Sequence, residues 1–269
     1  MYAVDPKILQ KLEAHVRRVL IIDPNPAASR LLADQMKGLG ARDLYFEPEE
    51  RRALEMAREC DPCIIFVECG GPKLDGGAFT RKLRRSNLAC RMAPVIMMTS
   101  DATAATIKDA RDSGVHEFLR KPFTAGDLLK RVMAVAIKPR DWIEGVGYVG
   151  PDRRRFNSAE FSGSRKRKAD KAQSEAEAQV QVIDQAVRIL RAALNQFDND
   201  PNQALRSMRD QATTLKQMAT SGAGEARLAV AVSVLEMTLA NAAPTRADLE
   251  APVKGVLALY PTVENKSAA

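Results

Sequence analysis

Four polar residues of the chain each follow a short apolar run, and their side chains could do chemistry together. They are Asp23, Glu68, Thr99 and Lys121. Carboxylates can hold a divalent cation, and an ammonium group pairs with negatively charged oxygens. The sequence around Glu68 raises the sharpest question, because an apolar run ends on this acid and continues into a loop of glycine and proline. A shorter aspartate would be the better acceptor for a phosphoryl group.

These residues stand at the ends of strands in a predicted α/β domain. Short β-rich runs alternate with helical periods over residues 17–137, which predicts a flavodoxin-like, doubly wound, five-stranded parallel sheet with helices on both faces. The predicted strands are 19–22, 44–46, 63–67, 95–98 and 118–119. The predicted helices are 27–37, 49–59, 78–85, 102–113 and 125–136. In such a sheet the active site lies at the carboxyl ends of the strands, where the four polar residues fall.

The rest of the chain divides where its pattern changes. Residues 1–16 form an N-terminal extension, and residues 138–171 lose all periodicity, which predicts a basic flexible linker. Over residues 172–262 apolar residues recur at helical spacing in four stretches with short breaks. This pattern predicts an all-α, antiparallel helical bundle, with a tail over 263–269.

Composition narrows the class of protein. The chain has 269 residues, a net charge of +7, 45% hydrophobic and 28% charged residues, as in an ordinary soluble protein. No apolar run approaches the ~20 residues of a membrane span, so we expect a cytoplasmic protein. Cys60 and Cys63 have the spacing of a metal or redox pair, but no second close pair follows, and His15 and His116 are the only histidines. We therefore expect inert thiols and no metal site.

Over residues 17–137 the chain resembles the receiver domain of bacterial response regulators. Five motifs carry the resemblance in the order of that family: VLIIDPN at 19–25, IIFVECGGPKLDG at 64–76, VIMMTS at 95–100, Phe118, and KPF at 121–123. The resemblance implies that Asp23 belongs to an acidic pair for Mg²⁺ and that Glu68 takes the phosphoacceptor position. It also implies that Thr99 and Phe118 are the switch residues and that Lys121 is the family's invariant lysine.

Two positions depart from the family pattern. Pro24 replaces the second acid and offers neither a carboxylate nor a backbone N–H. Glu68 is one methylene longer than aspartate, so we expect its carboxylate to project into the phosphoryl space, accept a hydrogen bond from Thr99 and pair with Lys121. Since Mg²⁺ needs oxygen ligands in near-octahedral geometry, we expect its binding to be weak or absent.

These departures predict a non-catalytic pseudo-receiver rather than an enzyme. The expected function is a phosphorylation-independent signalling adaptor in a bacterial two-component pathway, with sensor kinases, phosphotransfer proteins or scaffold proteins as partners. By resemblance, the partner surface is the face formed by the fourth helix, fifth strand and fifth helix of the domain. Two questions stay open. Glu68 either holds an active-like state or is a tolerated acid beside Lys121, and either Glu68 or Asp75 could still serve as a phosphoacceptor in a phosphorylatable regulator.

Most of the chain's excess positive charge lies in the predicted linker. Residues 152–171 hold eight Lys and Arg against three Asp and Glu. The candidate anion-binding residues are Arg153, Arg154, Arg155, Arg165, Lys166, Arg167 and Lys168. They could form a cyclic di-GMP site, because arginine forks suit phosphates and guanine edges, or a solvated tether. We expect no nucleic-acid binding, since no recognition helix or aromatic platform accompanies the charge.

One stretch of the predicted bundle resembles, in part, the His-x-Leu-Lys-Gly helix of histidine phosphotransfer domains. Residues 212–219 read ATTLKQMA, with Thr213 in place of the phosphorylated histidine and Gln217 in place of glycine. No histidine follows His116, so the bundle cannot carry phosphohistidine. A chance match of an amphipathic helix is the favoured explanation of this pattern. Either way, the bundle is expected to be an interaction or dimerisation module, with a homodimer among the possibilities.

Overall fold

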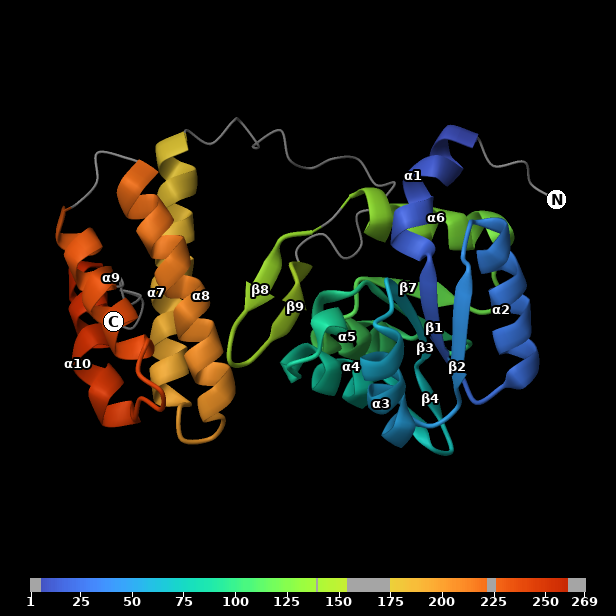
Figure 1. Cartoon of the computed structure of the whole chain (residues 1–269), viewed down its shortest axis with the longest axis horizontal. Helices are drawn as coiled ribbons and strands as arrows, with labels where there is room; N and C mark the ends of the chain where they lie inside the picture. Colours follow the sequence, from blue (N-terminus) through green and yellow to red (C-terminus); the bar gives the residue numbers. More distant parts are fainter. Residues whose placement is uncertain (1–5, 139, 154–174, 222–225, 261–269) are drawn as a thin grey trace, which may run out of the picture. The chain divides into compact units, whose positions relative to one another are not determined.

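The computed structural model describes residues 6–138, 140–153, 175–221 and 226–260 (Figure 1). The chain forms two compact units. The first comprises Met1–Ile143 with Tyr148–Phe161, and the second comprises Glu144–Gly147 with Ser162–Ala269. In the described residues, no helix is long and apolar enough to cross a membrane.

The first unit is built on the parallel sheet that the sequence predicts. Its strands are β1 (Arg18–Ile22), β2 (Asp43–Glu47), β3 (Ile64–Glu68), β6 (Val95–Thr99) and β7 (Glu117–Arg120), in the order β2-β1-β3-β6-β7. All neighbouring strands in this sheet pair parallel. From β1 the chain continues to β2 on one side of the sheet, and from β3 it continues to β6 and β7 on the other side. The switch point of the sheet therefore lies between the carboxyl ends of β1 and β3.

Helices cover both faces of the sheet, as predicted. On one face lie α2 (Pro26–Gly38) and α6 (Ala125–Ile137), and on the other lie α3 (Glu50–Cys60), α4 (Gly76–Arg85) and α5 (Ala104–Ser113). Alternate residues of each strand feed the two cores, because successive side chains point to opposite faces. In β1, for example, Val19 and Ile21 join the first core and Leu20 and Ile22 the second, all fully buried.

An additional helix belongs to this unit. Helix α1 (Pro6–Val16) buries Leu12 and Val16 completely in the core shared with α2 and α6. The sequence analysis placed residues 1–16 outside the domain as an extension. The short helix is stable because α6 covers its apolar side, and a single-sequence pattern does not reveal that contact.

The segment expected to be an irregular linker begins with regular structure. Strands β8 (Trp142–Glu144) and β9 (Val149–Pro151) form a two-stranded sheet. Its second strand lies so close to the end of α5 that a Cβ on Gly114 would be 2.6 Å from Val149 O. Gly114 therefore permits an approach that a larger residue would block. The prediction of an irregular linker is thus wrong for residues 142–144 and 149–151, and residues 154–171 lie outside the described part of the chain.

The described part of the second unit is a bundle of four helices, as the sequence predicts. They are α7 (Glu175–Asn195), α8 (Pro201–Ser221), α9 (Ala226–Leu239) and α10 (Arg246–Leu259). Each helix contacts the next, and α10 contacts α7, so the four helices enclose one apolar core. The short Glu144–Gly147 segment also belongs to this unit: Val146 is buried in the core, and Gln203 Nε2 of α8 donates to Glu144 Oε1 at 2.9 Å.

Two further short strands and a 3-10 helix belong to the first unit. Strands β4 (Gly70–Gly71) and β5 (Leu74–Asp75) form a tight antiparallel pair directly after β3, and a 3-10 helix, η1 (Ala89–Met92), precedes β6. The β4–β5 pair shapes the loop that follows Glu68 and leads into α4.

Candidate functional site

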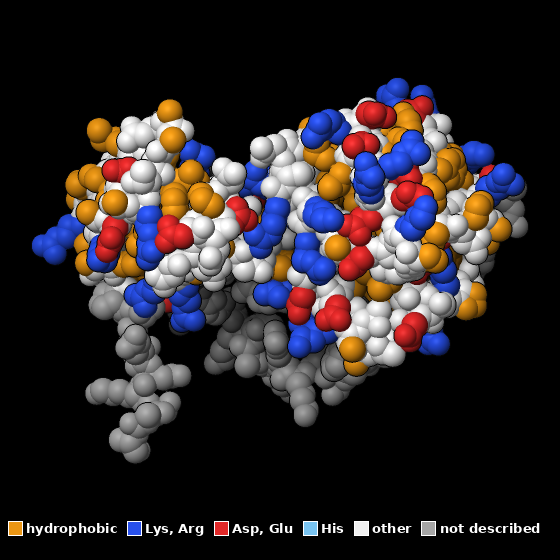
Figure 2. Space-filling model, turned by 90° about the horizontal axis from the view of Figure 1, so that it is seen from below, with side chains coloured by type: hydrophobic (Ala, Val, Ile, Leu, Met, Phe, Trp, Pro, Cys, Tyr) orange, Lys and Arg blue, Asp and Glu red, His pale blue; other side chains and the backbone are white. Residues whose placement is uncertain are grey.

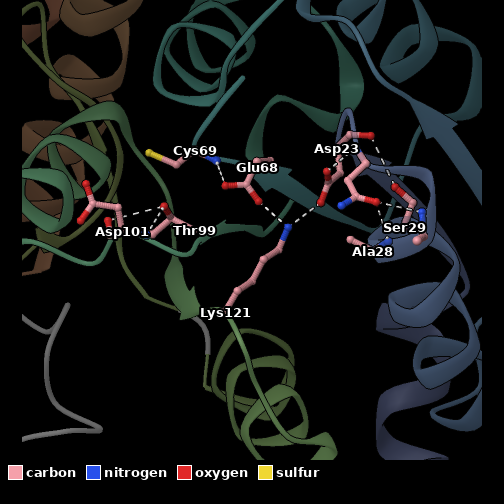
Figure 3. A network of polar contacts seen from close by, with 10 residues as sticks. Asp23, Ala28, Ser29, Glu68, Cys69, Thr99, Asp101 and Lys121 are labelled. Carbon is pink, nitrogen blue, oxygen red and sulfur yellow. Dashed lines mark hydrogen bonds and ion pairs between the residues drawn. The ribbon is translucent and has the colours of Figure 1, made fainter. Parts of the chain in front are cut away.

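Three charged side chains meet at the carboxyl edge of the sheet. Lys121 Nζ donates a hydrogen bond to Asp23 Oδ2 at 2.6 Å and another to Glu68 Oε2, so the ammonium group bridges the two carboxylates (Figure 3). The side chains of Asp23, Glu68 and Lys121 are 2%, 13% and 22% exposed. The predicted pairing of Glu68 with Lys121 is confirmed. We call these three residues the strand-end triad.

Local structure positions each member of the strand-end triad. Asp23 follows β1, and its second oxygen, Oδ1, accepts from Asn25 N at 2.8 Å. Asn25 in turn caps α2 by accepting from Ala27 N and Ala28 N. This arrangement explains why the acid comes just before a helix start, since the cap and the carboxylate together satisfy the free N–H groups of the turn.

Glu68 and Lys121 are positioned by backbone contacts on neighbouring strands. Glu68 ends β3, and its Oε1 accepts from Cys69 N at 3.1 Å. A Cβ on Gly76 would lie 2.3 Å from Glu68 O, so glycine is required where α4 begins beside β3. Lys121 N donates to Thr99 O at 2.7 Å, continuing the pairing of β7 with β6, and the Lys121–Pro122 peptide is cis.

The strand-end triad has one cation for two acids. Burial raises the pKa of the Glu68 carboxyl, and the negative charge of Asp23 raises it further; the hydrogen bond and the charge of Lys121 offset only part of this shift. Burial alone would lower the pKa of Lys121, but hydrogen bonds to Asp23 and Glu68 outweigh it, so this pKa is raised. The lysine is therefore held firmly in its charged form, and one carboxylate charge remains in excess.

The Thr99 hydroxyl does not reach Glu68, contrary to the sequence-based expectation. Thr99 Oγ1 accepts from Asp101 N at 3.1 Å and lies 3.5 Å from Asp101 O, within its own loop (Figure 3). The short threonine side chain is satisfied by the turn that follows β6. Phe118 is partly buried against the second core. Asp75 caps α4, where its Oδ1 accepts from Ala78 N at 2.8 Å.

The donor set at this edge does not fit Mg²⁺. The two carboxylates that remain near the expected metal position, Asp23 and Glu68, are both bound to Lys121 Nζ. Pro24 supplies no further carboxylate, and its ring lies against the loop after Glu68, since a Cβ on Gly71 would be 2.9 Å from Pro24 Cγ. Within the described residues, no three His, Cys, Asp or Glu side chains are grouped so that they could hold a metal ion.

The basic segment contributes one described residue, and that residue has a structural role. Arg153 Nη1 pairs with Asp112 Oδ1 at 2.8 Å, and its guanidinium lies 4.2 Å above the centre of the Tyr148 ring. These contacts fasten the end of the β8–β9 pair to α5, so Arg153 is already occupied. The other candidate anion-binding residues lie outside the described part of the chain: Arg154, Arg155, Arg165, Lys166, Arg167 and Lys168.

The remaining sequence candidates have ordinary surroundings. Thr213 is exposed on α8, and its hydroxyl donates to Arg209 O of the same helix at 3.0 Å. Cys60 and Cys90 are buried free thiols, and burial raises the pKa of Cys60 to about 11, which disfavours the reactive thiolate. These observations agree with inert thiols.

A second polar cluster, at the opposite edge of the sheet, was missed by the sequence analysis. Arg84 of α4 is completely buried, and its guanidinium donates to Gly114 O and Ala93 O, both at 2.9 Å. It also lies 5.3 Å from the centre of the Trp142 ring. The only sequence signal is that α4 ends in several basic residues, and nothing in that run distinguishes the buried arginine from the exposed ones.

Comparisons with known proteins find similarity over part of the chain. Residues 19–133 match the family model described as response regulator receiver domain. The KDP operon transcriptional regulatory protein KdpE of Escherichia coli K12 is 32% identical over 114 residues, which cover 42% of this chain and 48% of KdpE. The DNA-binding dual master transcriptional regulator RpaA of Synechocystis is 30% identical over 118 residues, covering 44% of this chain and 48% of RpaA. The chain thus spans about half the length of these curated relatives.

Among solved structures, a putative response regulator from Chloroflexus aurantiacus is similar at a TM-score of 0.42 and 20% sequence identity, over 45% of this chain and 97% of that one. The family match includes β1 from its second residue onward, the other four strands of the sheet, and all three members of the strand-end triad. Over residues 19–133 the chain therefore carries a response regulator receiver domain.

Proposed function

We propose that the chain is a non-catalytic signalling adaptor whose receiver domain works without phosphorylation. In this proposal the receiver domain regulates a two-component pathway by occupying proteins that would otherwise bind a phosphorylatable receiver. Partners of this kind are sensor kinases, phosphotransfer proteins or scaffold proteins, and the adaptor meets them in the cytoplasm. The helical bundle serves as an interaction module rather than as a phosphohistidine carrier, and the chain has no enzymatic activity.

The observation that carries the proposal is the bridge that Lys121 makes between Asp23 and Glu68. Phosphoryl transfer depends on positive charge placed around the transferred group, from metal ions and from basic side chains. Here the lysine is already bound by a carboxylate that projects from the phosphoacceptor position. A dianionic phosphoryl group would have to enter a site with an excess negative charge, where the cation of the triad, Lys121, is already paired with two carboxylates. This arrangement favours a fixed conformation over a phosphorylation cycle.

The contact of Pro24 with the loop after Glu68 supports the same proposal. A residue with a carboxylate at position 24 could help to hold Mg²⁺, whereas the proline ring lies against Gly71 instead. The change thus removes a metal ligand and places an apolar ring against the β4–β5 pair. Pro24 and Glu68, the two departures from the family pattern, both disfavour phosphoryl transfer at this site. A binding role for the domain surface therefore accounts for the site better than a chemical role does.

Capture of partners from a bacterial lysate tests the adaptor function. Wild-type chain, Glu68→Ala and the control Glu55→Ala are cross-linked in parallel to cell extract, and captured proteins are identified by mass spectrometry. Glu55 is exposed on α3 and lies outside the strand-end triad, so its replacement controls for the loss of one acidic charge. We expect wild type and Glu55→Ala to recover two-component signalling proteins without any phosphodonor. Recovery by wild type only after treatment with a phosphodonor would overturn the proposal.

The Glu68→Ala sample separates two versions of the proposal. If Glu68→Ala loses the captured signalling proteins, the ion pair with Lys121 sets the binding conformation. If Glu68→Ala keeps them, the domain surface binds independently of the triad. A cyclic di-GMP effector remains the alternative raised by the basic segment, but Arg153 is engaged with Asp112 and no described contact favours that function.

A further inference from the structure

Helix α9 of the bundle is apolar on its outer side as well as on its inner side. Leu228, Val232, Leu235 and Leu239 are buried in the bundle core. On the outer side, Val230, Val234 and Met237 are 65%, 47% and 74% exposed. A helix that is hydrophobic on all sides is normally buried. The exposed apolar side of α9 is therefore a candidate interaction surface. Figure 2 shows hydrophobic side chains at the surface of the helical unit.

The outer side of α9 also lacks charge. Arg227 and Glu236 are the charged residues of this helix. Glu236 Oε2 pairs with Lys216 Nζ of α8 at 2.8 Å, so Glu236 lies on the flank facing α8. At 100° per residue, Val230, Ser233, Val234 and Met237 share one side of the helix, opposite the core leucines, and Arg227 lies beside that side near the helix start. We call Val230, Ser233, Val234 and Met237 the outer stripe. A charged partner surface would be desolvated against this stripe without compensation.

We propose that the outer stripe of α9 binds the same stripe on a second copy of this chain, in an antiparallel, twofold-symmetric helix pair. This inference does not rest on the proposed function of the receiver domain. It assigns a partner to a surface of the bundle, and it makes the chain a homodimer through its second unit.

Self-association fits the distribution of apolar surface in this chain. Eight large hydrophobic side chains are exposed among the described residues, and three of them belong to α9. The other five lie on five different elements: α2, β2, η1, α6 and α7. No other described element therefore offers a matching apolar stripe. In a twofold interface the same patch serves both partners, so an uncharged stripe meets an uncharged stripe.

The order of side chains along the outer stripe favours the antiparallel arrangement. A twofold axis between positions 233 and 234 places Val230 opposite Met237 of the partner subunit, and Ser233 opposite Val234 of the partner subunit. In this antiparallel pair the smaller residue of each pair faces a larger one. In a parallel pair Ser233 would face Ser233 of the partner subunit, and the helices would pack less closely. Antiparallel helices also oppose their macrodipoles favourably.

The dimer should be weak. Helix α9 has 14 residues, and at 1.5 Å per residue it spans about 20 Å. A pair of such helices buries less than the ~1,200 Å² at the lower limit of standard stable interfaces. We therefore expect a reversible equilibrium with a dissociation constant on the order of micromolar.

Sedimentation velocity of the full chain tests the proposal. The samples span roughly two orders of magnitude in concentration around the micromolar range. Wild type should shift from monomer to dimer, and Met237→Glu should weaken association by at least about tenfold, because two carboxylates would enter the apolar contact. Met92→Glu is the matched control, since Met92 is an exposed methionine of the first unit and is 50% exposed. A wild type that stays monomeric, or a Met237→Glu variant that dimerises like wild type, would overturn the proposal.

Disulfide trapping tests the antiparallel register. In the proposed pair, the two copies of position 233 lie near the twofold axis, whereas the two copies of position 230 are about 10 Å apart along the helix. Mild oxidation should therefore cross-link Ser233→Cys efficiently and Val230→Cys poorly. The unsubstituted chain, with its four free cysteines, sets the background. Equal cross-linking of the two variants, or none above this background, would contradict the antiparallel pair.

Discussion

The two edges of the receiver sheet carry opposite charge arrangements. At the carboxyl edge, one ammonium group, Lys121, lies between two carboxylates. At the amino edge, one carboxylate, Glu117 at the start of β7, lies between Arg131 and Arg140, with Arg131 Nη1 at 3.1 Å from its Oε2. One edge therefore has an excess of negative charge and the other an excess of positive charge.

The amino edge is also sealed by the Arg84 cluster. Burial lowers the pKa of Arg84 to about 9, and its guanidinium is surrounded by backbone carbonyls rather than by a carboxylate. His116 Nδ1 lies 3.2 Å from Arg84 Nη2, and burial together with Arg84 lowers the pKa of His116 well below its usual value. The histidine is consequently neutral at physiological pH and can accept a hydrogen bond from Arg84.

The difference between the edges teaches which charged residues support the fold and which are available for function. Arg84 is completely buried and bonds three loop carbonyls, so it holds together the turns that precede β6 and β7. The strand-end triad is partly exposed, with Lys121 22% accessible, so a partner or ligand can reach it. We expect the largest effects on stability at the amino edge and the largest effects on signalling at the carboxyl edge.

Replacing Arg84 should break the fold most strongly. Arg84→Met keeps the volume but leaves the carbonyls of Gly114, Arg91 and Ala93 without their donor. We expect a loss of about 3 to 5 kcal/mol in the free energy of unfolding, measured by urea denaturation. Arg81→Met, on the exposed side of the same helix, should change this free energy by less than about 0.5 kcal/mol. Equal effects of the two variants would contradict the structural role of Arg84.

Replacing Lys121 should be the most damaging change at the carboxyl edge. Lys121→Met leaves Asp23 and Glu68 facing each other without a cation, and we expect a loss of about 2 kcal/mol at pH 7, less than for a fully buried pair. Without Lys121 the pKa of the Glu68 carboxyl, which burial already raises, should rise further. A carboxyl group with a raised pKa destabilises the folded state when it is ionised. The loss of stability in Lys121→Met should therefore become smaller as the pH falls toward about 4. A deficit independent of pH would argue against charge as the cause.

Replacing Glu68 should change stability least. Glu68→Gln removes the excess charge and leaves a neutral Asp23–Lys121 pair, so we expect a change within about 1 kcal/mol at pH 7. Because burial raises the pKa of Glu68, wild type loses this group's contribution to stability as the pH rises through the folded pKa. The stability of Glu68→Gln relative to wild type should therefore increase as the pH rises from acidic to neutral. Denaturation curves across this range check the sign, and a relative loss would contradict it.

The carboxyl edge could be predicted because its residues occupy positions that the fold itself singles out. Asp23, Glu68, Thr99 and Lys121 follow strands, and parallel strands bring their carboxyl ends together. The pairing of Glu68 with Lys121 followed from this placement. The hydrogen bond between Thr99 and its own loop could not be predicted in this way. Whether a threonine hydroxyl bonds a nearby backbone group or a distant side chain depends on loop geometry, which the sequence pattern does not specify.

The amino edge could not be predicted, because its contacts join residues that are ordinary in their local sequence. Arg84 is one of three basic residues in the last turn of α4. Its burial depends on Gly114 and Trp142, which lie far along the chain. The burial of α1 and the β8–β9 pair depends on tertiary contacts in the same way. The four helices of the bundle were predicted from apolar periodicity alone, but the apolar outer side of α9 became evident only with the core assigned.

Intact-mass measurement after incubation with Mg²⁺ and acetyl phosphate tests most directly the proposal that the receiver domain works without phosphorylation. Wild type, the double variant Pro24→Asp/Glu68→Asp and a phosphorylatable receiver as reagent control are treated together. We expect no mass gain for wild type and a phosphoryl adduct on the control, while an adduct on the double variant would show that these two positions alone block the chemistry. A stable phosphoryl adduct on wild type, whether on Glu68 or on Asp75, would contradict the account.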